Sequence, residues 1–242
     1  MTTINWEGIT NSQICVQQRW RPDADPRMAF FDQRAPTWNQ NFTEAARTLD
    51  RLTSLRERLG LNVGQSLLEV GCGTGLITGW LVENVFPGQV VAADFSREML
   101  VQAQKRKLSA ELWLMDICEE PIPERLFDVV FCFNSFPHFR DKVLALRNIS
   151  SLLASDGRLL ILHLAGSTQL NQFHTRLAHP VCNDLMPTAD AWPGLMEEAN
   201  LKVQSFTDEP ELFLLEAVAG CPPHQTHTLL EPVQSSLQML TR

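Results

Sequence analysis

The chain has 242 residues, 44% of them hydrophobic, and a formal net charge of −8. A sequence of this length and composition can bury the core of a single α/β domain, and nothing in it requires a second one. The excess of acidic residues argues against a nucleic-acid partner, because such proteins carry a basic surface. The longest basic tract is Lys105-Arg106-Lys107.

The amino-terminal residues and the cysteines point to a protein of the cytoplasm. Residues 1–11 lack a basic stretch followed by an apolar one, and no apolar run approaches the roughly eighteen residues that span a membrane. We therefore expect neither export nor membrane insertion. The six cysteines show no C-x-x-C spacing, and we interpret them as reduced thiols of a cytoplasmic protein.

The first predicted helix is amphipathic and extends from Thr43 to Leu59. Before it, residues 1–27 form an extension with Trp6 and Trp20. This extension either covers the site as a lid or packs on the sheet, and packing is the favoured alternative.

The most informative stretch runs from Leu67 to Gly75, with the sequence LLEVGCGTG. A buried strand, residues 66–70, leads through glycines to a helix predicted over residues 74–84. The G-x-G-x-G spacing differs from the G-x-G-x-x-G of dinucleotide-binding enzymes, because Leu76 occupies the sixth position. The turn therefore favours a ligand without a pyrophosphate, and a dehydrogenase is a distant alternative.

A second strand, Val90 to Asp94, ends in a carboxylate nineteen positions after Gly75. An acid at this place can accept hydrogen bonds from both hydroxyls of a ribose. The alternative role for Asp94 is the N-cap of the helix predicted from Arg97 to Lys107. Since Ser96 can serve as that cap, we expect Asp94 to be left for the ligand.

Two further strands end in polar residues. Residues 111–115 are followed by Asp116, and residues 127–133 are followed by Asn134. Open α/β sheets bind ligands outside the carboxyl ends of their strands. We therefore expect Glu69, Asp94, Asp116 and Asn134 to converge on one crevice.

Together, LLEVGCGTG and VVAADFSREML resemble the class I S-adenosylmethionine-dependent methyltransferases, over roughly residues 28–219. The resemblance implies S-adenosylmethionine as cofactor and assigns most of its contacts. Its methionyl part would lie on Glu69, Gly71, Cys72, Gly73 and Gly75; its ribose on Asp94; its adenine between Phe95 and Met99, with Asp116 and Ile117 at the amino edge; and the methyl-transfer face would be lined by Asn134, Ser135 and Phe136.

A second, narrower resemblance is to a bacterial subgroup of this family. It rests on FFDQRAPTW at residues 30–38, FPHFRDK at 136–142, and the pair NQFH at 171–174 and DLMP at 184–187. The sequence does not name the substrate of that subgroup.

The second half of the chain completes the predicted sheet. A helix over residues 139–154 stops at Ser155-Asp156-Gly157 with a left-handed glycine, and a fifth strand, 158–164, follows. A helix over 189–199 precedes strands at 201–206 and 211–219. The family implies a Rossmann-like, doubly wound α/β fold with seven strands in the order 3-2-1-4-5-7-6, strand 7 antiparallel, and helices on both faces.

This pattern divides the chain into three parts. Residues 1–43 are an amino-terminal extension or lid, residues 44–220 the methyltransferase domain with an insertion at 165–188, and residues 221–242 a tail. Within the tail, residues 229–240 form a short helix or are disordered.

The catalytic candidates are His138, His163 and His174. One of them could act as a general base, or His163 and His174 could bind a metal ion together with Asp184. The third alternative is that a histidine has only a structural role, as a cap, a hydrogen-bond partner of the backbone or part of an apolar wall. This alternative is favoured for His163, which lies between two leucines in a strand. The predicted acceptor pocket consists of Trp38, Phe136, Phe139, Asn171 and Asp184; these aromatic residues are also typical of a core.

The sequence thus predicts a methyltransferase for a small-molecule acceptor, whose methylated atom (O, N, S or C) stays open. Methyl transfer would proceed in line, by proximity and orientation. The alternatives are a methyltransferase for protein or RNA and a catalytically silent protein that binds the cofactor. The oligomeric state is left open, as is the presence of a metal.

Overall fold

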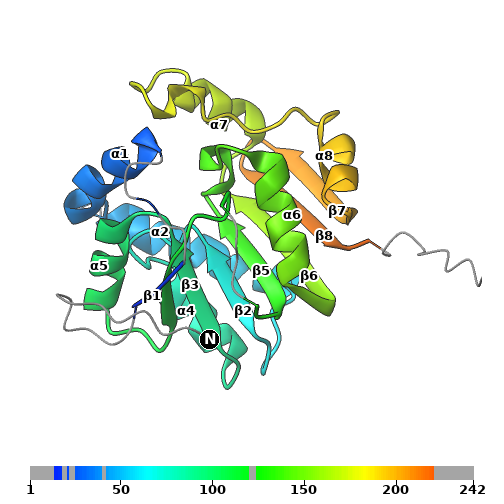
Figure 1. Ribbon diagram of the computed structural model, residues 1–242, viewed down its shortest axis with the longest axis horizontal. Helices are drawn as coiled ribbons and strands as arrows, with labels where there is room; N and C mark the ends of the chain where they lie inside the picture. Colours follow the sequence, from blue (N-terminus) through cyan, green and yellow to red (C-terminus); the bar gives the residue numbers. More distant parts are fainter. Residues whose placement is uncertain (1–13, 18–20, 22–24, 40–41, 120–123, 221–242) are drawn as a thin grey trace, which may run out of the picture.

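The computed structural model describes residues 14–17, 21, 25–39, 42–119 and 124–220. They form an eight-stranded sheet in the order β1-β4-β3-β2-β5-β6-β8-β7, with helices on both faces (Figure 1). None of the described helices is long and apolar enough to cross a membrane. The strands are β1 (Ile14–Val16), β2 (Leu67–Val70), β3 (Val90–Asp94), β4 (Glu111–Leu114), β5 (Phe127–Phe133), β6 (Leu153–His163), β7 (Leu201–Glu209) and β8 (Leu212–Ala219).

Strands β2 to β8 have the predicted order, and β8 runs antiparallel to both β6 and β7. The eighth strand corrects the prediction of seven. Ile14–Val16 pairs in parallel with β4, with Ile14 opposite Leu112. Part of the predicted extension therefore packs on the edge of the sheet, whereas Trp6 and Trp20 lie outside the described residues.

The alternation of side chains along the buried strands places helices on both faces of the sheet. In β3, Val91 and Ala93 join the core beneath α6 and α8, whereas Val90 and Ala92 pack on the side of α4 and α5. Figure 1 shows α6 in front of the sheet and α2 behind it. The helices are α1 (Pro26–Arg34), α2 (Phe42–Ser54), α3 (Arg56–Leu59), α4 (Thr78–Val85), α5 (Arg97–Lys105), α6 (Lys142–Leu152), α7 (Ser167–His174) and α8 (Trp192–Glu198), with short 3₁₀ turns η1 (Ala35–Thr37), η2 (Phe136–His138) and η3 (Val181–Asn183).

Two local predictions were wrong. The helix predicted from Thr43 to Leu59 is divided into α2 and α3 at Leu55. Gly157 is not left-handed, and β6 already begins at Leu153. A Cβ on Gly157 would lie 2.7 Å from the carbonyl oxygen of Phe127, so this glycine allows a close approach of two strands rather than an unusual turn.

The insertion at 165–188 folds back over the sheet and meets α1. In Figure 1, α1 and α7 both lie above the carboxyl ends of the central strands. Val181 of η3 is buried in a cluster with Phe31 and Ala35 of the α1–η1 segment and Met99 of α5. The crevice beneath is therefore covered from both sides.

Candidate active site

The turn after β2 brings bare backbone to the crevice. Gly71, Gly73 and Gly75 have φ values of +77°, +55° and +72°, in the left-handed region that favours glycine. A Cβ on Gly71 would lie 2.4 Å from the Cβ of Ser135, so this glycine lets β2 and β5 approach each other. At Gly73 the nearest atom to such a Cβ would be the sulfur of Met99 at 4.0 Å, so this glycine faces open space.

Asp94 at the end of β3 fixes this turn. Its two carboxylate oxygens accept the backbone N–H groups of Gly73 and Ser96, each at 2.8 Å. Ser96 is the N-cap of α5, as predicted, and accepts the N–H of Met99 at 3.2 Å. Asp94 nevertheless has backbone partners of its own, which corrects the expectation that it is left entirely to a ligand. Burial raises the pKa of Asp94 to about 6.

Glu69 on β2 is the second buried carboxyl group at the turn. It accepts a hydrogen bond of 2.6 Å from the hydroxyl of Thr78 at the start of α4. Burial raises the pKa of Glu69 to about 8, so the group is largely protonated at neutral pH.

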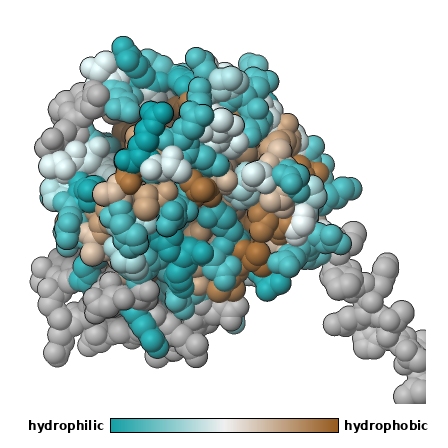
Figure 2. Space-filling view, turned by 90° about the horizontal axis from the view of Figure 1, so that it is seen from above, coloured by the Kyte–Doolittle hydropathy of each residue, from teal (hydrophilic) through white to brown (hydrophobic). Residues whose placement is uncertain are grey.

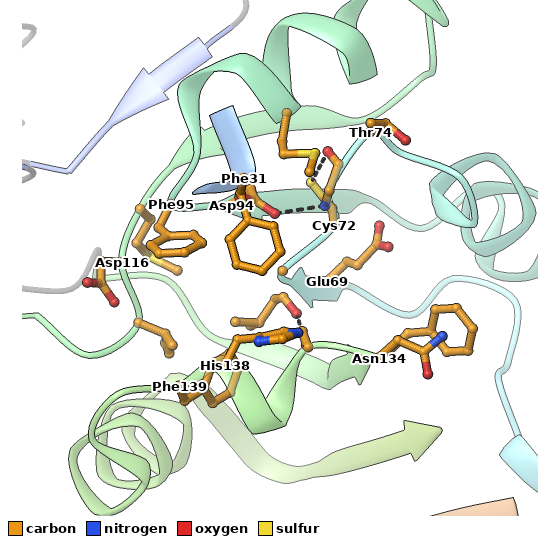
Figure 3. A pocket seen from close by; sticks show the side chains of 18 of the residues that line it. Phe31, Glu69, Cys72, Thr74, Asp94, Phe95, Asp116, Asn134, His138 and Phe139 are labelled. Atoms are coloured by element: carbon orange, nitrogen blue, oxygen red, sulfur yellow. Dashed lines mark hydrogen bonds between the residues drawn. The ribbon is translucent and has the colours of Figure 1, made fainter. Parts of the chain in front are cut away.

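These residues open on one cavity of about 1070 Å³, a volume that includes its open mouth. In Figure 3, Asp116 lies at one end of this cavity and Asn134 at the other. Of the predicted cofactor residues, only Gly75 does not line it. The cavity is lined by Glu69, Gly71, Cys72, Gly73, Asp94, Phe95, Met99, Asp116, Ile117 and Asn134 among the predicted cofactor residues, and by Trp38, His138 and Phe139 among the other candidates.

The Asp116 end of the cavity contains residues that the sequence pattern did not single out. Arg140 forms an ion pair with Asp116, and the N–H of Cys118 donates to the same carboxylate at 2.8 Å. Gln17, just after β1, accepts the backbone N–H of Asp116 at 3.0 Å. Asp25 also lines the cavity. Since no strand-end pattern marks these residues, only the folded chain brings them together.

His138 lines the cavity and is held from behind by the insertion. Its Nδ1 lies 2.8 Å from Oδ2 of Asp184, and Oδ1 of Asp184 accepts a hydrogen bond of 3.0 Å from Arg27. The ring of Phe31 packs edge-on against His138, with centroids 5.0 Å apart. Burial alone would raise the pKa of Asp184, but the hydrogen bond from His138 and the nearby charges of His138 and Arg27 lower it below its ordinary value.

His163 and His174 do not line the cavity. His163 is fully buried beside Phe213, and its burial, followed by repulsion from His138 and His174, lowers its pKa to about 3. Burial also lowers the pKa of His174, whose ring centroid lies 5.1 Å from that of His138. Both rings are therefore largely neutral at physiological pH. Nε2 of His163 and Nδ1 of His174 are buried without a hydrogen-bond partner among the described residues.

The candidate metal ligands do not form a metal centre. Across residues 14–17, 21, 25–39, 42–119 and 124–220, no group of three or more His, Cys, Asp or Glu side chains could hold a metal ion. Asp184 instead binds His138 and Arg27.

The predicted acceptor residues divide into two sets. Trp38 and Phe139 line the cavity, whereas Phe136 is buried behind it between Phe139 and Trp192. Asn171 binds the backbone N–H and carbonyl of Met186, at 2.7 and 3.1 Å. Its side chain thus braces the insertion, which corrects its expected place in the acceptor pocket.

Comparison with known proteins agrees with this geometry. Residues 68–161 match the family model of a methyltransferase domain. The chain is 30% identical over 175 residues to the methyltransferase GfsG of Streptomyces halstedii, covering 67% of this chain and 62% of that protein. It is 29% identical over 172 residues to the O-methyltransferase cnsE of Penicillium expansum, covering 66% and 60%. The chain spans about three fifths of the length of these two relatives.

The fold also matches solved structures. The structure of a DhpI–SAH complex superposes with a TM-score of 0.63 at 19% sequence identity, covering 81% of this chain and 96% of that one.

Proposed function

The chain belongs to the class I S-adenosylmethionine-dependent methyltransferases, and we propose that it methylates a small molecule bound in the cavity between Asp94 and His138. One observation carries this proposal. The glycine turn and Asp94, which suit a nucleoside, share a single covered cavity with an imidazole, which suits acid–base chemistry.

The residues of the cavity fit the cofactor. The open space at Gly73 admits a ligand against the backbone, and Asp94 has lone pairs left for two ribose hydroxyls. Phe95, Met99 and Ile117 offer apolar surface for an adenine, and the Asp116 carboxylate could accept from its amino group. Neutral Glu69 and the backbone of the turn would then hold the methionyl part.

The work left to the protein is alignment and exclusion of water. When bound, S-adenosylmethionine supplies an electrophilic methyl group. The cover formed by α1 and η3 keeps water from the crevice, and the fixed turn holds one reactant in place. His138 is the group best placed to take a proton from an acceptor.

A small acceptor is favoured over a macromolecule. The burial of Val181 against Phe31 and Ala35 closes the crevice above the cavity, which leaves room for a compound but not for a folded protein or a duplex. The net charge of −8 also gives no electrostatic attraction for RNA.

The test supplies methyl-labelled S-adenosylmethionine and the protein to a cell extract separated into small-molecule, protein and RNA fractions. We expect enzyme-dependent label in the small-molecule fraction. Label confined to protein or RNA would support the macromolecular alternative. Cofactor binding without label in any fraction would indicate a catalytically silent protein.

A further inference from the structure

Arg27, Asp184 and His138 form a continuous polar chain at the edge of the cavity. From it we propose that the acceptor atom is the oxygen of a hydroxyl group on a largely apolar, ring-bearing compound, that His138 takes the hydroxyl proton, and that Arg27 is a positioning residue for this step. The proposal rests on the proposed function and names its substrate class.

The orientation of the His138 ring follows from the carboxylate behind it. Oδ2 of Asp184 contacts Nδ1 of His138 at 2.8 Å, and an ionised carboxylate can only accept, so Nδ1 carries the proton. In a neutral imidazole the other nitrogen, Nε2, is then an acceptor. Since Nδ1 is bound to Asp184 and His138 lines the cavity, Nε2 is the nitrogen left to meet an acceptor hydroxyl.

Arg27 prevents the carboxylate of Asp184 from turning, because it occupies the second oxygen at 3.0 Å. Arg27 is itself fixed by Asp25, the N-cap of α1, through contacts of 2.8 to 3.0 Å from Nε and Nη2. The positioning residue thus comes from the segment before the methyltransferase core.

The other charged and titratable groups near this chain are Lys142, His163 and His174. Lys142 donates to the backbone carbonyls of Pro137 and Phe139, which hold the short helix that carries His138. His163 and His174 are neutral for the reasons given above. Lys142 keeps its charge and interacts electrostatically with Asp184 and Arg27. The ring of His138 is hydrogen-bonded to Asp184 and, through it, to Arg27.

The charges in the cavity suit a hydroxyl better than an amine. An ammonium group needs a carboxylate, but none of the four acids that line the cavity is left for an acceptor: Asp25 is paired with Arg27, and Asp94, Asp116 and Glu69 are assigned to the cofactor. A carboxylate or thiol acceptor ionises readily and needs no base, whereas an alcohol or phenol does.

Aromatic surface beside His138 indicates an apolar acceptor. Phe31 contacts both His138 and Trp38, with ring centroids 5.0 and 5.6 Å away. Trp38 lines the cavity and is 47% exposed, so it extends this surface to the mouth. Figure 2 looks down on this side of the molecule, where apolar surface interrupts the hydrophilic one.

The acceptor oxygen forms the new O–CH₃ bond while the S–CH₃ bond breaks, and the electron pair of that bond stays on sulfur, which becomes a neutral thioether. The hydroxyl proton passes to Nε2 of His138, and the resulting imidazolium is stabilised by Asp184. Release of this proton to water restores the site.

The first test compares four naphthalenes that differ in one group: 2-naphthol, 2-naphthylamine, 2-naphthoic acid and 2-naphthalenethiol, each with methyl-labelled S-adenosylmethionine. We expect 2-naphthol to be methylated fastest, and His138→Ala to lower that rate by roughly 10² with cofactor affinity unchanged. Faster methylation of another naphthalene, or a His138→Ala rate within threefold of the wild type, overturns the hydroxyl assignment but leaves the proposed function standing. If the protein binds the cofactor and methylates none of the four, the hydroxyl assignment is overturned, and the proposed function is decided by the extract experiment alone.

The second test addresses Arg27 through the pH dependence of kcat. Arg27→Met removes a positive charge beside Asp184, so the midpoint of the rate profile should move to higher pH. Asp184→Asn removes the negative charge, so the midpoint should move down. We expect kcat to fall about tenfold in each, with little change in KM. Arg27→Lys keeps the charge and should keep the wild-type midpoint.

Arg34→Met is the matched control, because Arg34 lies on the same helix but packs on Phe30 and contacts neither Asp184 nor His138. It should leave both kcat and the midpoint unchanged. A loss of folding would lower the rate without moving the midpoint in opposite directions in two variants. If the midpoint is the same in Arg27→Met, Asp184→Asn and the wild type, the positioning role is wrong.

Discussion

Gly71 and Gly73 both have left-handed backbone, but their surroundings differ. At the scale of single residues, one glycine therefore serves folding and the other serves ligand binding. A side chain at Gly71 would collide with Ser135, whereas one at Gly73 would enter the cavity. The first glycine is therefore required by the sheet and the second by the ligand.

We predict that Gly73→Val folds but loses cofactor binding by more than about 100-fold, because its side chain occupies the ligand's space, while Gly71→Ala melts at a markedly lower temperature. In each variant the fold is also destabilised by about 1 to 2 kcal/mol, because a residue other than glycine has to adopt left-handed backbone. Gly64→Ala measures that cost alone, since Gly64 has φ +90° and nothing within 4 Å of an added Cβ. Thermal melts and calorimetry with S-adenosylhomocysteine provide both readouts. A Gly73→Val protein with normal affinity would contradict the assignment.

Asp94 is predicted to serve both the turn and the cofactor. Asp94→Asn should weaken cofactor binding by about 2 kcal/mol, the loss of a charged hydrogen bond, whereas Asp94→Ala should also lower the melting temperature, because it leaves two backbone N–H groups without an acceptor. Asp128 is a matched control: it accepts the N–H and hydroxyl of Ser66 but does not line the cavity. Asp128→Ala should lower stability and leave affinity unchanged. Equal cofactor affinity in Asp94→Asn and the wild type would limit Asp94 to the turn.

Glu69 gives the cofactor-free protein a pH-dependent stability. Its pKa is raised from 4.5 in the unfolded chain to about 8 in the fold, so the folded state holds the proton more tightly. The stability it contributes is complete below about pH 4.5 and is lost as the pH rises through 8. Glu69→Gln removes this dependence. We therefore expect the melting temperature of the wild type to fall relative to Glu69→Gln between pH 5 and pH 8. If the melting temperatures of the two proteins change in parallel with pH, Glu69 is ionised in the folded protein.

At the scale of elements, the sequence pattern predicts buried strands from their local periodicity and the turn from the glycines at a strand end. The buried strands β3 and β5 match their predicted ranges, and the G-x-G-x-G turn leads to the cavity. The break at Leu55 and the early start of β6, at Leu153 rather than Arg158, were missed, because tertiary contacts decide them. The role of Arg27 could not be read from spacing either, since its partner Asp184 lies 157 positions away and no local motif marks the contact.

The contact between η3 and α1 is predicted to close the acceptor side. Val181→Asp would bury a charge in the cluster with Phe31 and Ala35, and should separate the two elements and lower turnover at least tenfold. Cofactor affinity should fall less than turnover, because the glycine turn and Asp94 are untouched and only Met99 and Phe95 of the cofactor residues belong to the cluster. Leu185→Asp is the control, since Leu185 lies in the same insertion but is 37% exposed. Hydrogen exchange over residues 167–186 should rise only in Val181→Asp. Unchanged exchange in that variant would mean that the cover does not depend on this contact.

At the scale of the whole molecule, the chain combines a sheet of predicted order with a cover built from two segments outside that order. The β2–β5 part of the sheet supplies the nucleoside side of the cavity, and residues 25–38 supply walls on the side of His138. The insertion lies behind these walls, with Val181 packed on Phe31 and Asp184 bound to His138. The division explains why the glycine turn and the strand-end acids, which lie at the edge of the sheet, predict the cofactor class but leave the acceptor open.

The central claim is that this cavity takes a nucleoside without a pyrophosphate, and calorimetric titration tests it most directly. S-adenosylmethionine and S-adenosylhomocysteine should each bind one site with micromolar-scale affinity, while NAD under the same conditions should produce no binding heat. Binding of NAD, or failure of both adenosyl compounds to bind the folded protein, would contradict the account.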